Sequence, residues 1–135
     1  MAGIVVADTL QADSTSTLVL KNGVANTPPT VQDSAGTQIG TFCRAWVNFN
    51  GTGTVAVRAS FNVRDITDNG TGDYTVNFTN ALPDANYSFV ITGTYGSANS
   101  FSITAPTTTA ARLSTYVTTT GNNQDQAFIS VAVFR

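Results

Sequence analysis

Histidine and glutamate are absent from this sequence, and lysine and cysteine occur once each, as Lys21 and Cys43. The lack of histidine removes the commonest general base and the commonest metal ligand. A single cysteine forms no disulfide within its own chain, and the neighbouring Phe42 and Trp46 favour a buried thiol over a reactive one. Charged residues make up only 10% of the chain, well under the usual ~25%. The polar surface must therefore be mostly uncharged.

Basic clusters and long apolar runs are missing as well. The basic residues are scattered and the net charge is −2, so no stripe can neutralise phosphates and we expect no nucleic-acid binding. No run approaches the ~20 apolar residues of a membrane span, so we expect no membrane insertion. The start MAGIVVADTLQ has no basic region, and we expect no signal peptide. These absences predict a soluble protein made in a cytoplasm.

Threonine and asparagine are abundant instead, with 23 and 12 copies among 135 residues. Threonine is β-branched and suits a pleated surface, whereas asparagine and glycine suit turns. Glutamate and lysine, which sustain exposed helix faces, are almost missing. The composition predicts an all-β fold.

Alternating apolar and polar residues predict the strands. The clearest run has five apolar residues in phase, which we expect on one face: Val55, Val57, Ala59, Phe61 and Val63. Further strands are expected at 45–50, 74–78, 87–91, 101–103, 113–119 and 128–134. Seven or eight strands at intervals of about ten residues predict an antiparallel β-sandwich or jelly-roll-like domain. The last strand is apolar on both faces, so we expect it at the centre of a sheet or at an interface.

The tetrapeptide Asn-Gly-Thr-Gly occurs twice, at Asn50–Gly53 and at Asn69–Gly72, each time between alternating runs. Asn-Gly supplies the positive φ angles of a tight hairpin turn. We therefore expect Asn50 with Gly51, and Asn69 with Gly70, to form two hairpin turns.

Residues 1–41 lack the regular alternation of apolar and polar residues found in residues 42–135, which we take as the β-sandwich-like domain. They carry short apolar patches, the breaker Pro28-Pro29 and a turn sequence at Asp33–Thr37. Too few apolar residues are contiguous to build a separate core. We expect an extended N-terminal arm lying on the following domain or on a neighbouring chain.

The acidic residues could in principle bind calcium or catalyse glycoside hydrolysis, but their spacing indicates neither kind of site. Asp65, Asp68 and Asp73 surround a glycine-rich turn, where we expect them to cap turns and not to bind calcium, because the spacing is not that of an EF-hand. Carboxylate pairs for glycoside hydrolysis can be drawn from Asp65 with Asp73, or from Asp84 with Asp125, but nothing singles them out. We expect no catalytic, cofactor-binding or metal-binding residue, and no enzyme.

Aromatic residues are the candidates for surface contacts. Trp46, Tyr74 and Tyr87 lie in or beside patterned strands, which favours packing in the core. Tyr95 lies in the loop Gly93–Gly96, where contact with a ligand and simple loop packing are equal alternatives. Arg58 is expected on a polar face, either paired with an aspartate across a subunit boundary or solvated.

One long stretch resembles a known family. The segments AWVNFNGTGTVA (45–56), SFNV (60–63), ITDNGTGDYTVNF (66–78) and ALPDANY (81–87) resemble tail-fibre-like structural proteins of tailed bacteriophages, especially those of marine and cyanobacterial hosts. The match covers about residues 45–89. It implies a virion component, a homotrimer used for host attachment or assembly, which contacts other virion proteins of the tail or capsid and a host surface glycan. No catalytic residue belongs to the pattern.

Two other functions remain open. The chain lacks the long repetitive shaft of the usual tail fibre, which raises the alternative of a capsid decoration or cement protein that stabilises the phage head. A glycan-active enzyme is the remote alternative. Low charge, the arm and the apolar last strand all predict surface that a monomer would leave exposed, in agreement with a homotrimer.

Overall fold

The computed structural model describes residues 19–20, 23, 28–94 and 99–135, and every structural statement refers to these residues. They form an all-β structure, and no helix occurs among them. Eight strands build an antiparallel β-sandwich, as the sequence predicts: β3 (Cys43–Asn50), β4 (Ala56–Phe61), β5 (Val63–Gly70), β6 (Asp73–Phe78), β7 (Ser88–Gly93), β8 (Asn99–Thr104), β9 (Ala110–Val117) and β10 (Ile129–Phe134).

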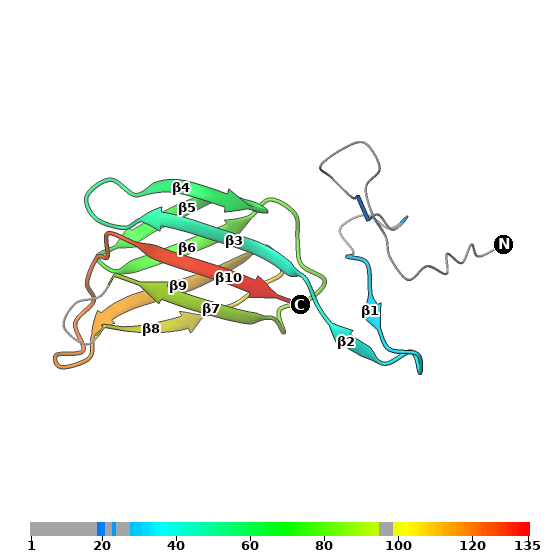
Figure 1. The fold of residues 1–135 in the computed structure, drawn as a ribbon. Coiled ribbons are helices and arrows are strands. Elements are labelled where there is room, and N and C mark those ends of the chain that lie inside the picture. The colour runs from blue at the N-terminus through cyan, green and yellow to red at the C-terminus, as the bar shows by residue number, and fades with distance from the viewer. Residues whose placement is uncertain (1–18, 21–22, 24–27, 95–98) are drawn as a thin grey trace.

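The two sheets of the sandwich have four strands each, in the orders β4-β3-β10-β7 and β5-β6-β9-β8 (Figure 1). We call them the first and the second sheet. The hairpins β3–β4, β5–β6 and β8–β9 each stay within one sheet, and the chain crosses to the other sheet after β4, β6, β7 and β9. The crossings place residues far apart in sequence on adjacent strands.

The core lies between the sheets and takes every second residue of the central strands. Its four largest fully buried side chains are Tyr74, Phe49, Leu113 and Ile129. The rings of Phe49 and Tyr74 meet edge to face across the sheets, with centroids 5.3 Å apart. Fully burying an apolar side chain of this size contributes about 1.5–3 kcal/mol. The alternation in the sequence therefore defines which face of each central strand enters the core.

The predicted place of the last strand is confirmed. β10 lies between β3 and β7 at the centre of the first sheet (Figure 1). Ile129, Val131 and Val133 point into the core, while Ser130, Ala132 and Phe134 lie half-buried on the other face. An apolar strand with neighbours on both sides leaves no exposed edge.

The prediction that five apolar residues of the 55–63 run share one face is wrong. The register between β3 and β4 shifts at Arg58, which is paired with no residue of β3. Phe49 therefore pairs with Val57, but Asn48 pairs with Ala59. A bulge of this kind adds one residue and reverses the alternation beyond it. Val57 therefore shares the face of the buried Phe49, whereas Phe61 shares the face of Trp46. Every residue of β4 is exposed because the strand lies at the sheet edge.

Both Asn-Gly-Thr-Gly segments lie at hairpins, but the predicted turn geometry is shifted. Asn50 ends β3 and residues 51–55 connect it to β4; the positive φ, 63°, belongs to Gly53 and not to Gly51. In the second hairpin Gly70 pairs with Asp73, so Thr71 and Gly72 form the two-residue turn. Gly70 has a φ of 125° there.

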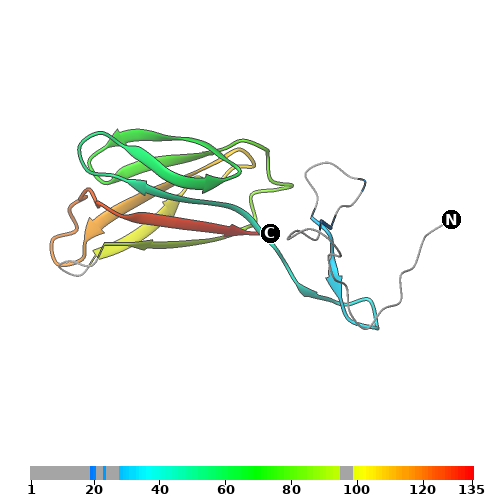
Figure 2. The same cartoon turned by 45° about the horizontal axis from the view of Figure 1, so that its top comes forward.

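The arm is described without gaps from Pro28 onward and contains a hairpin of β1 (Val31–Gln32) and β2 (Gln38–Gly40). Its turn is the predicted one at 33–37, where Oδ1 of Asp33 accepts hydrogen bonds from the N–H groups of Ala35 and Thr37, both at 2.9 Å. We call residues 31–40 the arm hairpin. It stands away from the sandwich, beyond the start of β3, in both views (Figures 1 and 2).

Candidate interaction surface

The outer face of the first sheet carries a row of apolar side chains. Phe61 pairs with Trp46, Trp46 with Ala132, and Ala132 with Val90, so the four residues form one line across β4, β3, β10 and β7. Directly paired residues of antiparallel strands lie on the same face. Phe61, Trp46 and Val90 are 54%, 39% and 48% exposed. We call this row the apolar stripe.

A row of small and polar residues runs beside the apolar stripe. It consists of Ala59, Asn48, Ser130 and Thr92, in which Nδ2 of Asn48 donates to Oγ of Ser130 at 2.7 Å. Arg58 reaches over this row from the bulge: its guanidinium donates to the carbonyl of Ala127 at 2.6 Å and lies 4.0 Å from the ring centroid of Phe128. Arg58 therefore adds a positive charge to this outer face, on the side of the polar row away from the stripe.

A groove of about 500 Å³ opens at the arm end of the sandwich. Its lining residues are Pro28, Pro29, Phe42, Cys43, Arg44, Phe61, Asn62, Thr79 and Asn80. The groove joins the root of the arm to one end of the apolar stripe, because Phe61 belongs to both.

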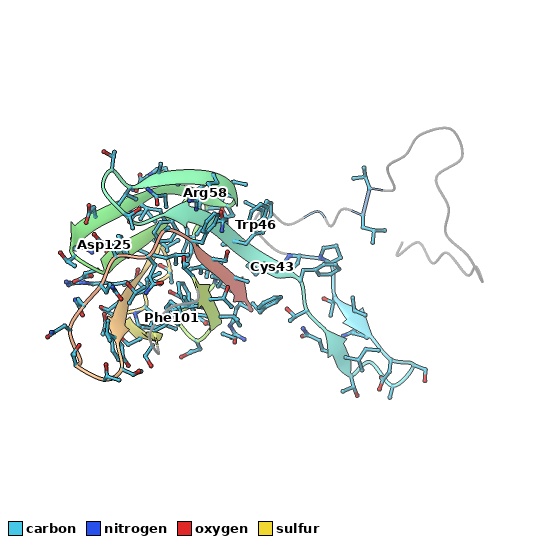
Figure 3. The ribbon with its side chains drawn as sticks, turned by 60° about the vertical axis from the view of Figure 1, so that its left-hand side comes forward. Cys43, Trp46, Arg58, Phe101 and Asp125 are labelled. Atoms are coloured by element: carbon cyan, nitrogen blue, oxygen red, sulfur yellow. The ribbon has the colours of Figure 1, made fainter. Side chains whose placement is uncertain are left out.

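The prediction that Cys43 and Trp46 are buried is wrong. Cys43 is half-buried in the groove lining, and its thiol donates to the carbonyl of Ala45 at 3.2 Å. Trp46 lies on the outer face because it is out of phase with the buried Ala45 and Val47 (Figure 3). The aromatic residues of β3 thus lie on both faces of the strand, Phe49 in the core and Trp46 outside, as the alternation of the sequence indicates.

The outer face of the second sheet has the opposite character. Here polar side chains bond to one another along the strands: Arg112 donates to Asp73 at 2.7 Å, and Asn77 donates to Thr67 at 2.9 Å. Asn69 also donates to Thr75, at 2.9 Å. A face whose polar groups are mutually satisfied is suited to water, whereas the apolar stripe is not. The sandwich therefore has one polar outer face and one outer face that carries an apolar row.

The three acids around the second turn act separately. Asp68 accepts the N–H of Gly70 at 2.9 Å, which is the expected turn capping. Asp65 accepts from Arg64, which with Asn77 lowers the pKa of its carboxyl. Asp73 pairs with Arg112, and this hydrogen bond likewise lowers its pKa. Within the described ranges, no three histidine, cysteine or acidic residues come together as metal ligands would.

The carboxylate pairs considered from the sequence do not meet at a common site. Asp84 is held by Arg135 at the arm end of the sandwich, with Oδ1 2.9 Å from Nε, and this hydrogen bond lowers the pKa of Asp84. Asp125 lies at the opposite end (Figure 3). Asp65 pairs with Asn77, four residues along β6 from Asp73. Each of the four carboxylates instead links neighbouring segments of the fold.

Asp125 belongs to a network that the sequence does not reveal. Its Oδ1 lies 2.7 Å from the buried hydroxyl of Tyr74 and accepts the N–H of Gly72 at 2.6 Å. The same hydroxyl lies 2.8 Å from the carbonyl of Gly51. Burial, and then the hydrogen bond to Asp125, raise the pKa of Tyr74. The only signal in the sequence is general: a buried tyrosine needs a partner for its hydroxyl.

The remaining aromatic candidates differ in their burial. Tyr74 is buried, as predicted. Tyr87 is half-buried and packs edge to face on Phe78, with centroids 5.9 Å apart, while its hydroxyl lies 3.1 Å from the carbonyl of Ala110. Tyr95, the predicted contact residue, lies outside the described residues.

Among the described residues, no helix has the length and hydropathy needed to cross a membrane. Comparison with protein-family models finds no match, and comparisons with curated proteins and with solved structures find none either.

Proposed function

We propose that this protein is a structural subunit of a bacteriophage virion, a tail-fibre-like homotrimer used for host attachment or assembly. The resemblance of residues 45–89 to tail-fibre-like proteins suggests this class. The observation that carries the proposal is the contrast between the two outer faces of the sandwich. One presents the apolar stripe Phe61-Trp46-Ala132-Val90, and the other a bonded network of polar side chains.

An exposed apolar row of this kind favours an assembly protein. Monomeric proteins rarely expose contiguous apolar patches, and large ones mark contacts with other proteins. A homotrimer uses the stripe for contacts between subunits and leaves the polar face of the second sheet toward water. In this arrangement the polar face, with its hydrogen-bonding side chains, is the surface available to a host glycan or to another virion protein.

A second candidate is a capsid decoration protein that stabilises the head. The arm hairpin favours it, because it stands away from the sandwich and can reach over a neighbouring subunit (Figure 2). Both candidates are virion components and differ in their place on the particle.

Antibody labelling of intact particles, viewed by electron microscopy, tests the proposal. We expect label at the tail. Label distributed over the head would replace the tail-fibre role with the decoration role. Particles that bind no antibody, although the same antibody recognises the purified protein, would contradict a place on the virion surface. Hydrolysis of host polysaccharide by the purified protein would instead support a glycan-active enzyme.

A further inference from the structure

The arm hairpin is too small to be stable without packing against another surface. It has two short strands, and a two-stranded hairpin is at best marginally stable in water unless it packs against something else. Ile39 in β2 is 65% exposed, the highest exposure of any large apolar side chain in the described part of the chain. Both views show the hairpin extending away from the sandwich of its own chain (Figures 1 and 2). Its own sandwich therefore leaves Ile39 uncovered.

The apolar stripe is likewise left exposed by its own chain. Trp46 lies on the central strand β3, and Phe61 and Val90 lie on the edge strands β4 and β7, so the exposed apolar side chains extend over the full width of the outer face. The arm hairpin of the same chain points away from this face. One molecule thus exposes Ile39 on its arm hairpin and the apolar stripe on its sandwich, and neither surface covers the other.

The charges of the two surfaces are complementary as well. Arg58 lies on the same outer face, separated from the stripe by the polar row. Within the described residues, its guanidinium bonds to neutral oxygens of Asn48 and Ala127 and forms no ion pair. Asp33 begins the turn of the arm hairpin, and its carboxylate accepts only backbone N–H groups in the described contacts. Opposite charges on two mating surfaces guide their encounter and fix their register.

We propose that the arm hairpin of one copy packs on the apolar stripe of a second copy, with Ile39 against Trp46 and Asp33 beside Arg58. The two surfaces are different parts of the chain, so the contact is heterologous, and such contacts close into a ring when the rotation permits. Three copies complete the ring, and this number rests on the homotrimer of the proposed function.

Cross-linking between two single-cysteine chains tests the contact. Both chains carry Cys43→Ser; one also carries Ile39→Cys and an affinity tag, and the untagged one carries Ala132→Cys. Thr104→Cys, on the exposed face of the second sheet, replaces Ala132→Cys in the matched control. After the chains are mixed and exchanged, a short bismaleimide should join tagged to untagged chains at least tenfold more with Ala132→Cys than with Thr104→Cys. Equal yields, or no joining, would overturn the proposal.

Trp46 is the only tryptophan and provides a second readout that does not need a cross-linker. As protein concentration rises, we expect its emission to shift to shorter wavelength and its quenching by acrylamide to fall, because the hairpin covers it. Ile39→Asp should abolish this change, and Gln38→Asp, at the adjacent exposed position, should keep it. A concentration-independent spectrum, or equal loss in both variants, would overturn the contact. Virion labelling tests the function separately, so the two ideas can fail independently.

Discussion

The hydroxyl of Tyr74 lies 2.7 Å from Oδ1 of Asp125, although the two residues are 51 positions apart in the sequence. Through this pair and the nearby carbonyl of Gly51, three connections at one end of the sandwich are tied together: residues 51–55, the turn at Gly72 and the segment before β10. Glycine is required at two of these points because the chain approaches closely. A Cβ at Gly51 would lie 2.6 Å from the Tyr74 hydroxyl, and one at Gly72 would lie 2.5 Å from the carbonyl of Thr115.

Gly51→Val should therefore lower the free energy of unfolding by about 1–3 kcal/mol, the usual cost of overpacking, because its side chain collides with Tyr74 and with the carbonyl of Gln126. Urea unfolding measures the change. Part of this loss should disappear in a Tyr74→Phe background, since the closest atom is then gone. Strictly additive losses would show that the collision with the hydroxyl is not the cause.

The stability of the protein should fall as the solution becomes alkaline, partly because of Tyr74. Its pKa is raised above the ordinary value of 10.0, so the protonated hydroxyl is favoured in the folded state. The corresponding stability is complete below pH 10 and is lost as the pH rises toward the folded pKa. Melting temperatures measured at increasing pH above 10 should fall more steeply for the parent than for Tyr74→Phe. Parallel curves would contradict the role of this hydroxyl.

Two neighbouring residues of β10 should respond oppositely to the same substitution. Val131→Asp places a carboxylate in the core and should abolish cooperative melting, whereas Ala132→Asp lies on the apolar stripe and should melt cooperatively. Ala132→Asp should nevertheless weaken assembly at least tenfold, as measured by sedimentation at a series of concentrations. An Ala132→Asp protein that assembles like the parent would show that the stripe is not an interface.

Removal of residues 1–40 should separate folding from assembly. The sandwich strands begin at Cys43 and contain the whole core, so the truncated chain should keep the β-sheet circular dichroism spectrum. Light scattering should give a monomer for it, and three times 14.1 kDa, about 42 kDa, for the full chain at micromolar concentration. A full chain that is monomeric, or a truncated one that is still trimeric, would contradict the role of the arm.

The features of the fold that depend on local alternation could be predicted from the sequence. Val47 and Phe49, or Val131 and Val133, repeat every second residue and enter the core as expected. The central position of β10 followed from its two apolar faces. These predictions succeed because a strand exposes alternate residues to opposite sides whatever its partners are.

Features that depend on pairing between strands could not be predicted in this way. The bulge at Arg58 moved Phe61 to the outer face, and a register shift is decided by the partner strand β3, not by the sequence of β4 alone. The Tyr74–Asp125 pair needs two distant loops to meet. Trp46 is different: its phase already placed it opposite Val47, but its size suggested the core.

The most direct test of a virion role is mass spectrometry of particles purified on a density gradient and washed in high salt. The account predicts that this chain is present in the particles in a fixed ratio to the major capsid protein, and in a multiple of three copies per particle. Its presence in the infected-cell lysate but absence from the washed particles would contradict the account.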